Sequence, residues 1–158
     1  MHRLVRRTSS FVAITLAACA SAGRGATSIR PLDSVPFASS LDVNLARMSK
    51  TPGGAYYRDI DVGTGTLVRG TEEVKVHYTG WLSNGVMFDS NANEAPPVTL
   101  PLGRGRVIKG WEEGLVGMRV GGRRQLVIPP ELGYGSIRTD KIPADAVLVF
   151  EIRVVSMK

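Results

Sequence analysis

The clearest pattern along this chain is an alternation of apolar and polar residues in two segments of its second half. Between residues 72 and 82 one face carries the apolar side chains, which are Val74, Val76 and Tyr78. Between residues 147 and 155 the apolar face consists of Leu148, Phe150, Ile152 and Val154. A period of two is typical of a strand with one buried face. We therefore predict two antiparallel strands that contribute to a common core.

Shorter segments complete the predicted fold. We expect further strands over residues 56–62 and 123–128, and a hairpin turn at Ser83-Asn84-Gly85, since Asn and Gly tolerate positive φ. One short helix is expected over Lys109–Leu115, followed by Gly117. The fold class is α+β, a small antiparallel sheet whose apolar face is covered by this single helix.

The first 50 residues follow a different pattern. Arg3, Arg6 and Arg7 precede a short apolar run from Phe11 to Ala18, which is typical of an export signal and too short to span a bilayer. Residues 19–50 are rich in small and polar residues, so we expect a flexible tether there, or else a short docked helix at residues 41–48. The predicted organisation is a signal peptide (1–18), a tether (19–50) and one domain (51–158).

Composition narrows the range of functions. The formal charge is +6, but +3 remains once residues 1–18 are removed, and no stacking aromatics accompany the basic residues, so we expect no nucleic-acid partner. The basic residues that cluster in sequence are interpreted as solvated, and are Arg104, Arg106, Lys109, Arg119, Arg123 and Arg124. Only two histidines and one cysteine occur, which argues against a metal site. We expect no cofactor.

An ordered set of short blocks carries the functional information. They are Tyr78-Thr79-Gly80, Phe88-Asp89-Ser90, Val107-Ile108, Gly110-Trp111, Tyr134-Gly135, Ile142-Pro143 and Leu148-Val149-Phe150. Together they resemble the FK506-binding-protein (FKBP) family of peptidyl-prolyl cis-trans isomerases, over about residues 56–158. The resemblance implies a twisted antiparallel sheet wrapped around one short helix, and a monomeric isomerase that binds proline-containing polypeptides. Macrolides of the FK506 and rapamycin type are further candidate ligands.

The resemblance also implies roles for individual residues. Three residues are expected to act on the twisting bond, namely Asp89, Tyr134 and Phe150. The residues expected to bind the prolyl segment are Tyr78, Phe88, Val107, Ile108, Trp111 and Ile142. Tyr134 and the backbone N–H of Ile108 would donate to substrate carbonyls. Asp89 would act on the imide or support Tyr78; taken alone, it also fits a turn-capping carboxylate.

The residues before the lone cysteine resemble a bacterial lipoprotein cleavage box, Leu16-Ala17-Ala18-Cys19. This resemblance implies that Cys19 becomes the N-terminus and carries lipid, so that the protein is exported and anchored to a membrane. In a diderm bacterium it would face the periplasm. An ordinary signal peptide cut after Ala20 or Ala22 is the alternative.

Some residues depart from the family pattern. Glu94 stands where many members carry an arginine that can pair with the aspartate, Val98 stands where some carry phenylalanine, and the loop after Tyr134 differs in length. These departures keep an alternative open, in which the domain is a weakly catalytic or non-catalytic module that binds polypeptides as a chaperone or scaffold.

Overall fold

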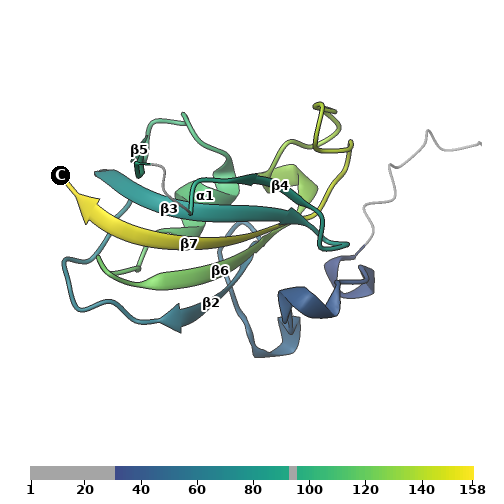
Figure 1. Cartoon of the computed structure of the whole chain (residues 1–158), viewed down its shortest axis with the longest axis horizontal. Coiled ribbons are helices and arrows are strands. Elements are labelled where there is room, and N and C mark those ends of the chain that lie inside the picture. The colour runs from purple at the N-terminus through teal and green to yellow at the C-terminus, as the bar shows by residue number, and fades with distance from the viewer. Residues whose placement is uncertain (1–30, 93–95) are drawn as a thin grey trace, which may run out of the picture.

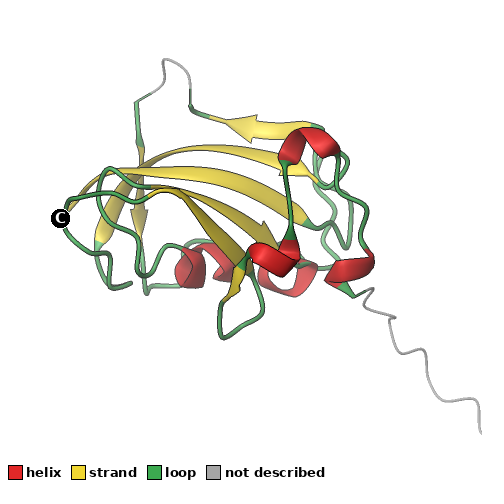
Figure 2. Ribbon diagram, turned by 90° about the horizontal axis from the view of Figure 1, so that it is seen from below, coloured by secondary structure: helices red, strands yellow, loops and turns green. Residues whose placement is uncertain are grey.

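The computed structural model describes residues 31–92 and 96–158, in which one antiparallel sheet packs against a short helix (Figure 1). Its strands are β1 (Ser49–Lys50), β2 (Tyr56–Asp61), β3 (Glu73–Leu82), β4 (Met87–Ser90), β5 (Val98–Pro101), β6 (Arg123–Ile128) and β7 (Leu148–Met157). They lie in the order β1-β2-β6-β7-β3-β4, and β5 also pairs with β3. The longer strands are curved and twisted (Figure 2). The antiparallel sheet with one short α-helix confirms the predicted fold class.

The core follows from the alternation on β3 and β7, which pair at the centre of the sheet. Val74 and Val76 of β3 and Ile152 of β7 are fully buried, as their shared face predicts. The register places Gly80 of β3 opposite Phe150 of β7, which matters for the site described below. Predicted strand ends agree with the structure to within about two residues, a usual margin for such boundaries.

Helix α1 (Lys109–Gly114) covers the apolar face of the sheet, and Leu115 is its C-cap. Two glycines of α1 allow the helix to approach β6 closely. A Cβ on Gly110 would lie 2.5 Å from Ile128 Cγ2, and one on Gly114 would lie 2.7 Å from Leu126 Cδ1. Ordinary carbon contacts need about 3.5–4.0 Å, so only glycine fits where the helix meets β6.

The two glutamates of α1 hold different loops. Glu113 accepts hydrogen bonds from Thr51 Oγ1 at 2.6 Å and from the Gly53 N–H at 2.8 Å. Glu112 accepts from the N–H groups of Gly103 and Gly105, at 2.5 and 3.0 Å. Adjacent residues on a helix point in different directions. The helix therefore anchors the β1–β2 turn through Glu113 and the loop between β5 and α1 through Glu112.

The N-terminal strap (residues 31–48) lies against the face of the sheet opposite α1. It consists of 3-10 turns, η1 (Leu32–Ser34), η2 (Ser39–Leu41) and η3 (Leu45–Arg47), drawn in blue in Figure 1. Leu41 is buried there with Val127 of β6, Val149 of β7 and Val147, which immediately precedes β7. Gln125 Nε2 donates a 2.6 Å hydrogen bond to the Leu41 carbonyl.

The strap corrects the expected tether, since residues 31–48 are packed onto the domain. The docked α-helix considered for residues 41–48 does not form either, because η2 and η3 are separate single turns. The predicted signal peptide, Cys19 and the tether up to residue 30 lie outside the described residues, as does Glu94. Within residues 31–92 and 96–158, no helix is long and apolar enough to cross a membrane.

Candidate functional site

Four aromatic side chains meet between the sheet and α1. Phe150 of β7 lies at the centre of this group. Its ring centroid is 5.2 Å from that of Trp111, 5.5 Å from that of Phe88 and 6.4 Å from that of Tyr78. The rings meet edge to face, at interplanar angles of 60° to 90°. Such contacts each contribute about 0.5–1.5 kcal/mol beyond the stabilisation from buried area. The contacts between the four rings therefore help to fix their positions.

Gly80 has no side chain, and this leaves room for the rings of Phe88 and Phe150. A Cβ on Gly80 would lie 2.7 Å from Phe150 Cε1 and 2.7 Å from Phe88 Cζ. The φ of Gly80 is not positive, so glycine is required there for space and not for backbone conformation. The Tyr78-Thr79-Gly80 block therefore supplies one ring of the cluster and the gap that two others fill.

The aromatic cluster forms part of a cleft of about 400 Å³. Its lining residues are Tyr78, Phe88, Asp89, Gly105, Arg106, Val107, Ile108, Trp111, Tyr134 and Phe150. All but one of the predicted site residues within the described ranges thus lie around one opening. The exception is Ile142, which is buried in the adjoining core and does not line the cleft. Its N–H instead donates a hydrogen bond to Thr139 Oγ1 at 3.0 Å, which shapes the loop after Tyr134.

Polar groups stand at the rim of the apolar cleft. Tyr134 is 39% exposed there, and Ile108 precedes the first residue of α1 as its N-cap. Among the residues that the structure describes, none accepts a hydrogen bond from the Tyr134 hydroxyl or from the Ile108 N–H. Both donors are therefore available to the carbonyl groups of a bound peptide.

Tyr78 and Asp89 form a pair inside the cleft. The Tyr78 hydroxyl donates to Asp89 Oδ2 at 2.6 Å, and the Ser90 N–H donates to Asp89 Oδ1 at 2.9 Å. Burial, together with the neighbouring Asp89 carboxylate, raises the pKa of Tyr78 to about 12. Tyr78 therefore remains a neutral donor at neutral pH and fixes the orientation of Asp89. Within residues 31–92 and 96–158, Asp89 forms no salt bridge.

Two contributions to the site were not predicted. Asn91 is buried, where its Oδ1 accepts the Tyr78 N–H at 2.7 Å and its Nδ2 donates to the Val76 carbonyl at 3.3 Å. It thus ties the start of the following loop to the strand that carries Tyr78. Arg106, interpreted from the sequence as one of several solvated cations, lines the cleft. Within the described ranges, no group of three or more His, Cys, Asp or Glu residues could hold a metal ion.

The comparisons with known proteins agree with this geometry. The family model for FKBP-type peptidyl-prolyl cis-trans isomerases matches residues 64–155. The chain belongs to this family. It is 45% identical over 106 residues to an FK506-binding protein of Neisseria meningitidis serogroup B, covering 66% of this chain and 97% of the relative. It is also 43% identical over 112 residues to the isomerase FkpA of Buchnera aphidicola, covering 70% of this chain and 44% of the relative.

Solved structures place the chain in the same family. The crystal structure of AtFKBP13 superimposes with a TM-score of 0.62 at 39% identity, covering 70% of this chain and 98% of the other. That of FkpA from Escherichia coli gives a TM-score of 0.64 at 33% identity, covering 70% and 51% respectively. The predicted activity, peptidyl-prolyl cis-trans isomerisation, is thereby confirmed at the level of the family. The N-terminal strap precedes residue 64 and so lies outside the matched segment.

Proposed function

We propose that the protein is an exported, lipid-anchored FKBP-type isomerase that accelerates rotation of Xaa-Pro bonds in polypeptides folding outside the cytoplasm. The observation that carries the catalytic part is the cleft, in which an apolar aromatic wall meets two hydrogen-bond donors with no acceptor among the described residues.

An apolar cleft of this kind suits the chemistry of the reaction. Amide resonance imposes a barrier of about 18–20 kcal/mol on rotation, and this resonance is lost in the twisted transition state. The twisted carbonyl is less dipolar than the planar one and therefore loses less when water is removed. A dry cleft thus binds the transition state better than the ground state, which is the requirement for catalysis. No nucleophile or metal is needed.

The residues divide this task between them. The rings of Trp111, Phe150 and Phe88 would enclose the prolyl ring, with Val107 at the edge. The Ile108 N–H and the Tyr134 hydroxyl would donate to the carbonyls on either side and hold the peptide in a turn. Asp89, oriented by Tyr78, would face the bond that twists. FK506- and rapamycin-type macrolides would occupy the same cleft and compete with peptides.

Catalysed exchange on a Leu-Pro peptide tests these roles. We expect Asp89→Ala and Tyr134→Phe each to lower kcat/KM by about tenfold or more, since each removes a group that acts at the reacting bond. Asp33→Ala is the matched control, because Asp33 is an exposed carboxylate on the strap. Unchanged activity in both cleft variants would rule out this assignment. A folded protein that binds the peptide without accelerating exchange would favour the binding-module alternative.

The export and anchoring part rests on the sequence before residue 20, with its basic start, apolar run and Leu16-Ala17-Ala18-Cys19 box. Lipid on Cys19 would hold a monomeric enzyme at a membrane, at the periplasmic face in a diderm bacterium. We expect Cys19→Ala to move the protein from the membrane fraction to the soluble fraction, and to abolish incorporation of labelled palmitate. Retention of the variant in the membrane would contradict a lipid anchor.

A further inference from the structure

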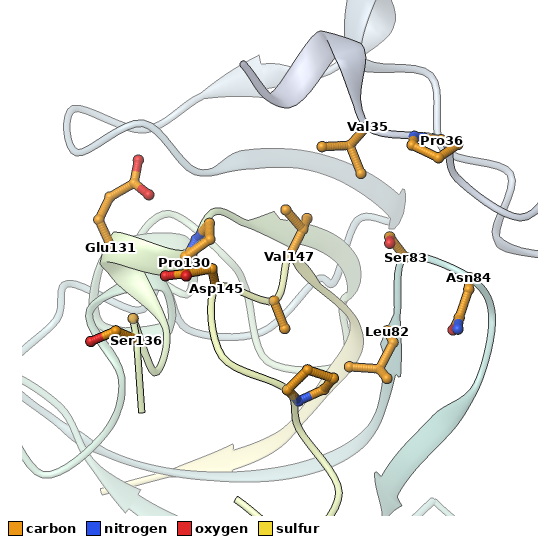
Figure 3. Close-up of a pocket in the computed structure, with 13 residues that line it drawn as sticks. Val35, Pro36, Leu82, Ser83, Asn84, Pro130, Glu131, Ser136, Asp145 and Val147 are labelled. Atoms are coloured by element: carbon orange, nitrogen blue, oxygen red, sulfur yellow. The ribbon is translucent and has the colours of Figure 1, made fainter. Parts of the chain in front are cut away.

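A second, larger depression lies outside the aromatic cleft. It has a volume of about 710 Å³ and is shown in Figure 3. We call it the strap groove because the N-terminal strap forms one wall, through Val35 and Pro36. Leu82, Ser83 and Asn84 from the β3–β4 turn form the second wall. The third is the segment from η4 (Pro130–Leu132) to the start of β7.

The strap groove and the aromatic cleft share two structural elements. In the segment after η4, Tyr134 lines the cleft while the next residue, Gly135, lines the groove. In the β3–β4 hairpin, Leu82 lines the groove while Phe88 lines the cleft. Consecutive Cα atoms lie about 3.8 Å apart, so the two openings have a common rim at Tyr134–Gly135. An extended chain leaving the cleft over this rim would enter the groove within a few residues.

The lining of the groove indicates the chemistry of an occupant. Most of the exposed lining is apolar, and Pro36, Leu82 and Val147 supply aliphatic walls from all three sides. Its charged lining residues are Glu131 and Asp145, both exposed, and none of the described residues that line it is basic. Neither carboxylate forms a salt bridge within residues 31–92 and 96–158. An apolar segment that also carries a lysine or arginine is therefore complementary to this groove.

We propose that the strap groove binds an apolar, lysine- or arginine-bearing segment of the same polypeptide whose proline occupies the aromatic cleft. This inference rests on the proposed isomerase site and extends its substrate to a longer chain. Two linked contacts raise affinity because the second contact forms at a high effective concentration. The strap wall precedes the segment matched by the family model, whereas Glu131 and Asp145 lie within it. The groove would therefore combine a part of the chain outside the matched segment with carboxylates of the family domain.

Binding and exchange measurements with the full-length protein test the proposal. The probes are a Leu-Pro tetrapeptide, which reaches only the cleft, and two 12-residue peptides with the same Leu-Pro. One is extended before the proline and one after it, each by a segment of Val, Leu and Lys. We expect one extended peptide to bind roughly tenfold tighter than the tetrapeptide. Glu131→Lys and Ser136→Trp should remove most of this gain and leave kcat/KM for the tetrapeptide unchanged.

Glu73→Lys is the matched control, because Glu73 is an exposed carboxylate at the start of β3, away from both openings. It should retain the full gain. The inference is overturned if neither extension binds more tightly, or if the gain survives both groove variants. It is also overturned if the groove variants change the sedimentation coefficient, which would show a second copy of the chain in the groove. Catalysis of the tetrapeptide without any gain refutes the groove alone, whereas no catalysis of the tetrapeptide refutes the isomerase site itself.

Discussion

Replacing Gly80 by alanine should distort the catalytic cleft without unfolding the protein. The added Cβ would lie 2.7 Å from Phe150 Cε1, 2.7 Å from Phe88 Cζ and 2.9 Å from Phe88 Cε2. Carbon atoms normally stay about 3.5–4.0 Å apart, so both rings must move by about 1 Å. Overpacking of this kind costs about 1–3 kcal/mol. Alanine restricts the unfolded chain and recovers about 0.4–1 kcal/mol, which leaves a net loss of about 1–2 kcal/mol.

The effect of Gly80→Ala on activity should exceed its effect on stability. A displacement of about 1 Å at reacting groups can reduce a rate by as much as 10²-fold, so we expect kcat/KM for a Leu-Pro peptide to fall at least about tenfold. Gly117→Ala is the control, because Gly117 has a φ of +82° and open space around its Cβ position. It should lose about 1–2 kcal/mol through backbone strain and keep full activity. Equal activity in the two variants would refute the assigned role of the rings.

Other features of the structure lead to measurable outcomes. Because the pKa of Tyr78 is raised to about 12, its contribution to stability is complete below pH 10 and is lost as pH rises toward 12; a tyrosinate absorbance titration should show a late step that Tyr78→Phe removes. Asp59→Ala removes the carboxylate that lies 2.6 Å from the buried guanidinium of Arg124. It should lower the free energy of unfolding, measured in urea, by roughly 2–4 kcal/mol. Asp61→Ala, at a more exposed pair, should cost about 0–1 kcal/mol. Leu41→Ala should lower the unfolding free energy by about 2–3 kcal/mol and leave tetrapeptide catalysis intact; an unchanged midpoint would contradict a packed strap.

Much of the sheet could be predicted because its pattern has a single physical cause. One face of β3 and of β7 is buried by α1, so their apolar residues recur with a period of two. The ordered sequence blocks then located the cleft, since all but one of the site residues taken from them line one opening. Ile142 is the exception and is buried in the adjoining core. A buried apolar loop residue gives the same sequence signal whether it lines a cleft or packs beneath it.

The strap was missed because single 3-10 turns have no apolar period to detect. The outward faces of the strands did carry a signal, since Val127 and Val149 are apolar residues on the side away from α1. Two apolar positions of this kind on neighbouring strands indicate that another segment of the chain covers the second face of the sheet. Asn91 and Glu112 were missed for another reason. Their roles depend on backbone N–H and C=O groups brought near by folding, and the residue types alone do not reveal these partners.

The central claim is that the cleft around Phe150 catalyses prolyl isomerisation. NMR exchange spectroscopy on a Leu-Pro tetrapeptide, with catalytic amounts of the full-length protein and of Phe150→Ala, tests this claim most directly. Uncatalysed exchange takes tens of seconds, so cross-peaks between cis and trans forms within a second report catalysis alone. We predict cross-peaks with the wild-type protein and their loss with Phe150→Ala, while the amide spectrum of the variant stays dispersed. Equal exchange with both proteins, or none with a folded wild-type protein, would contradict the account.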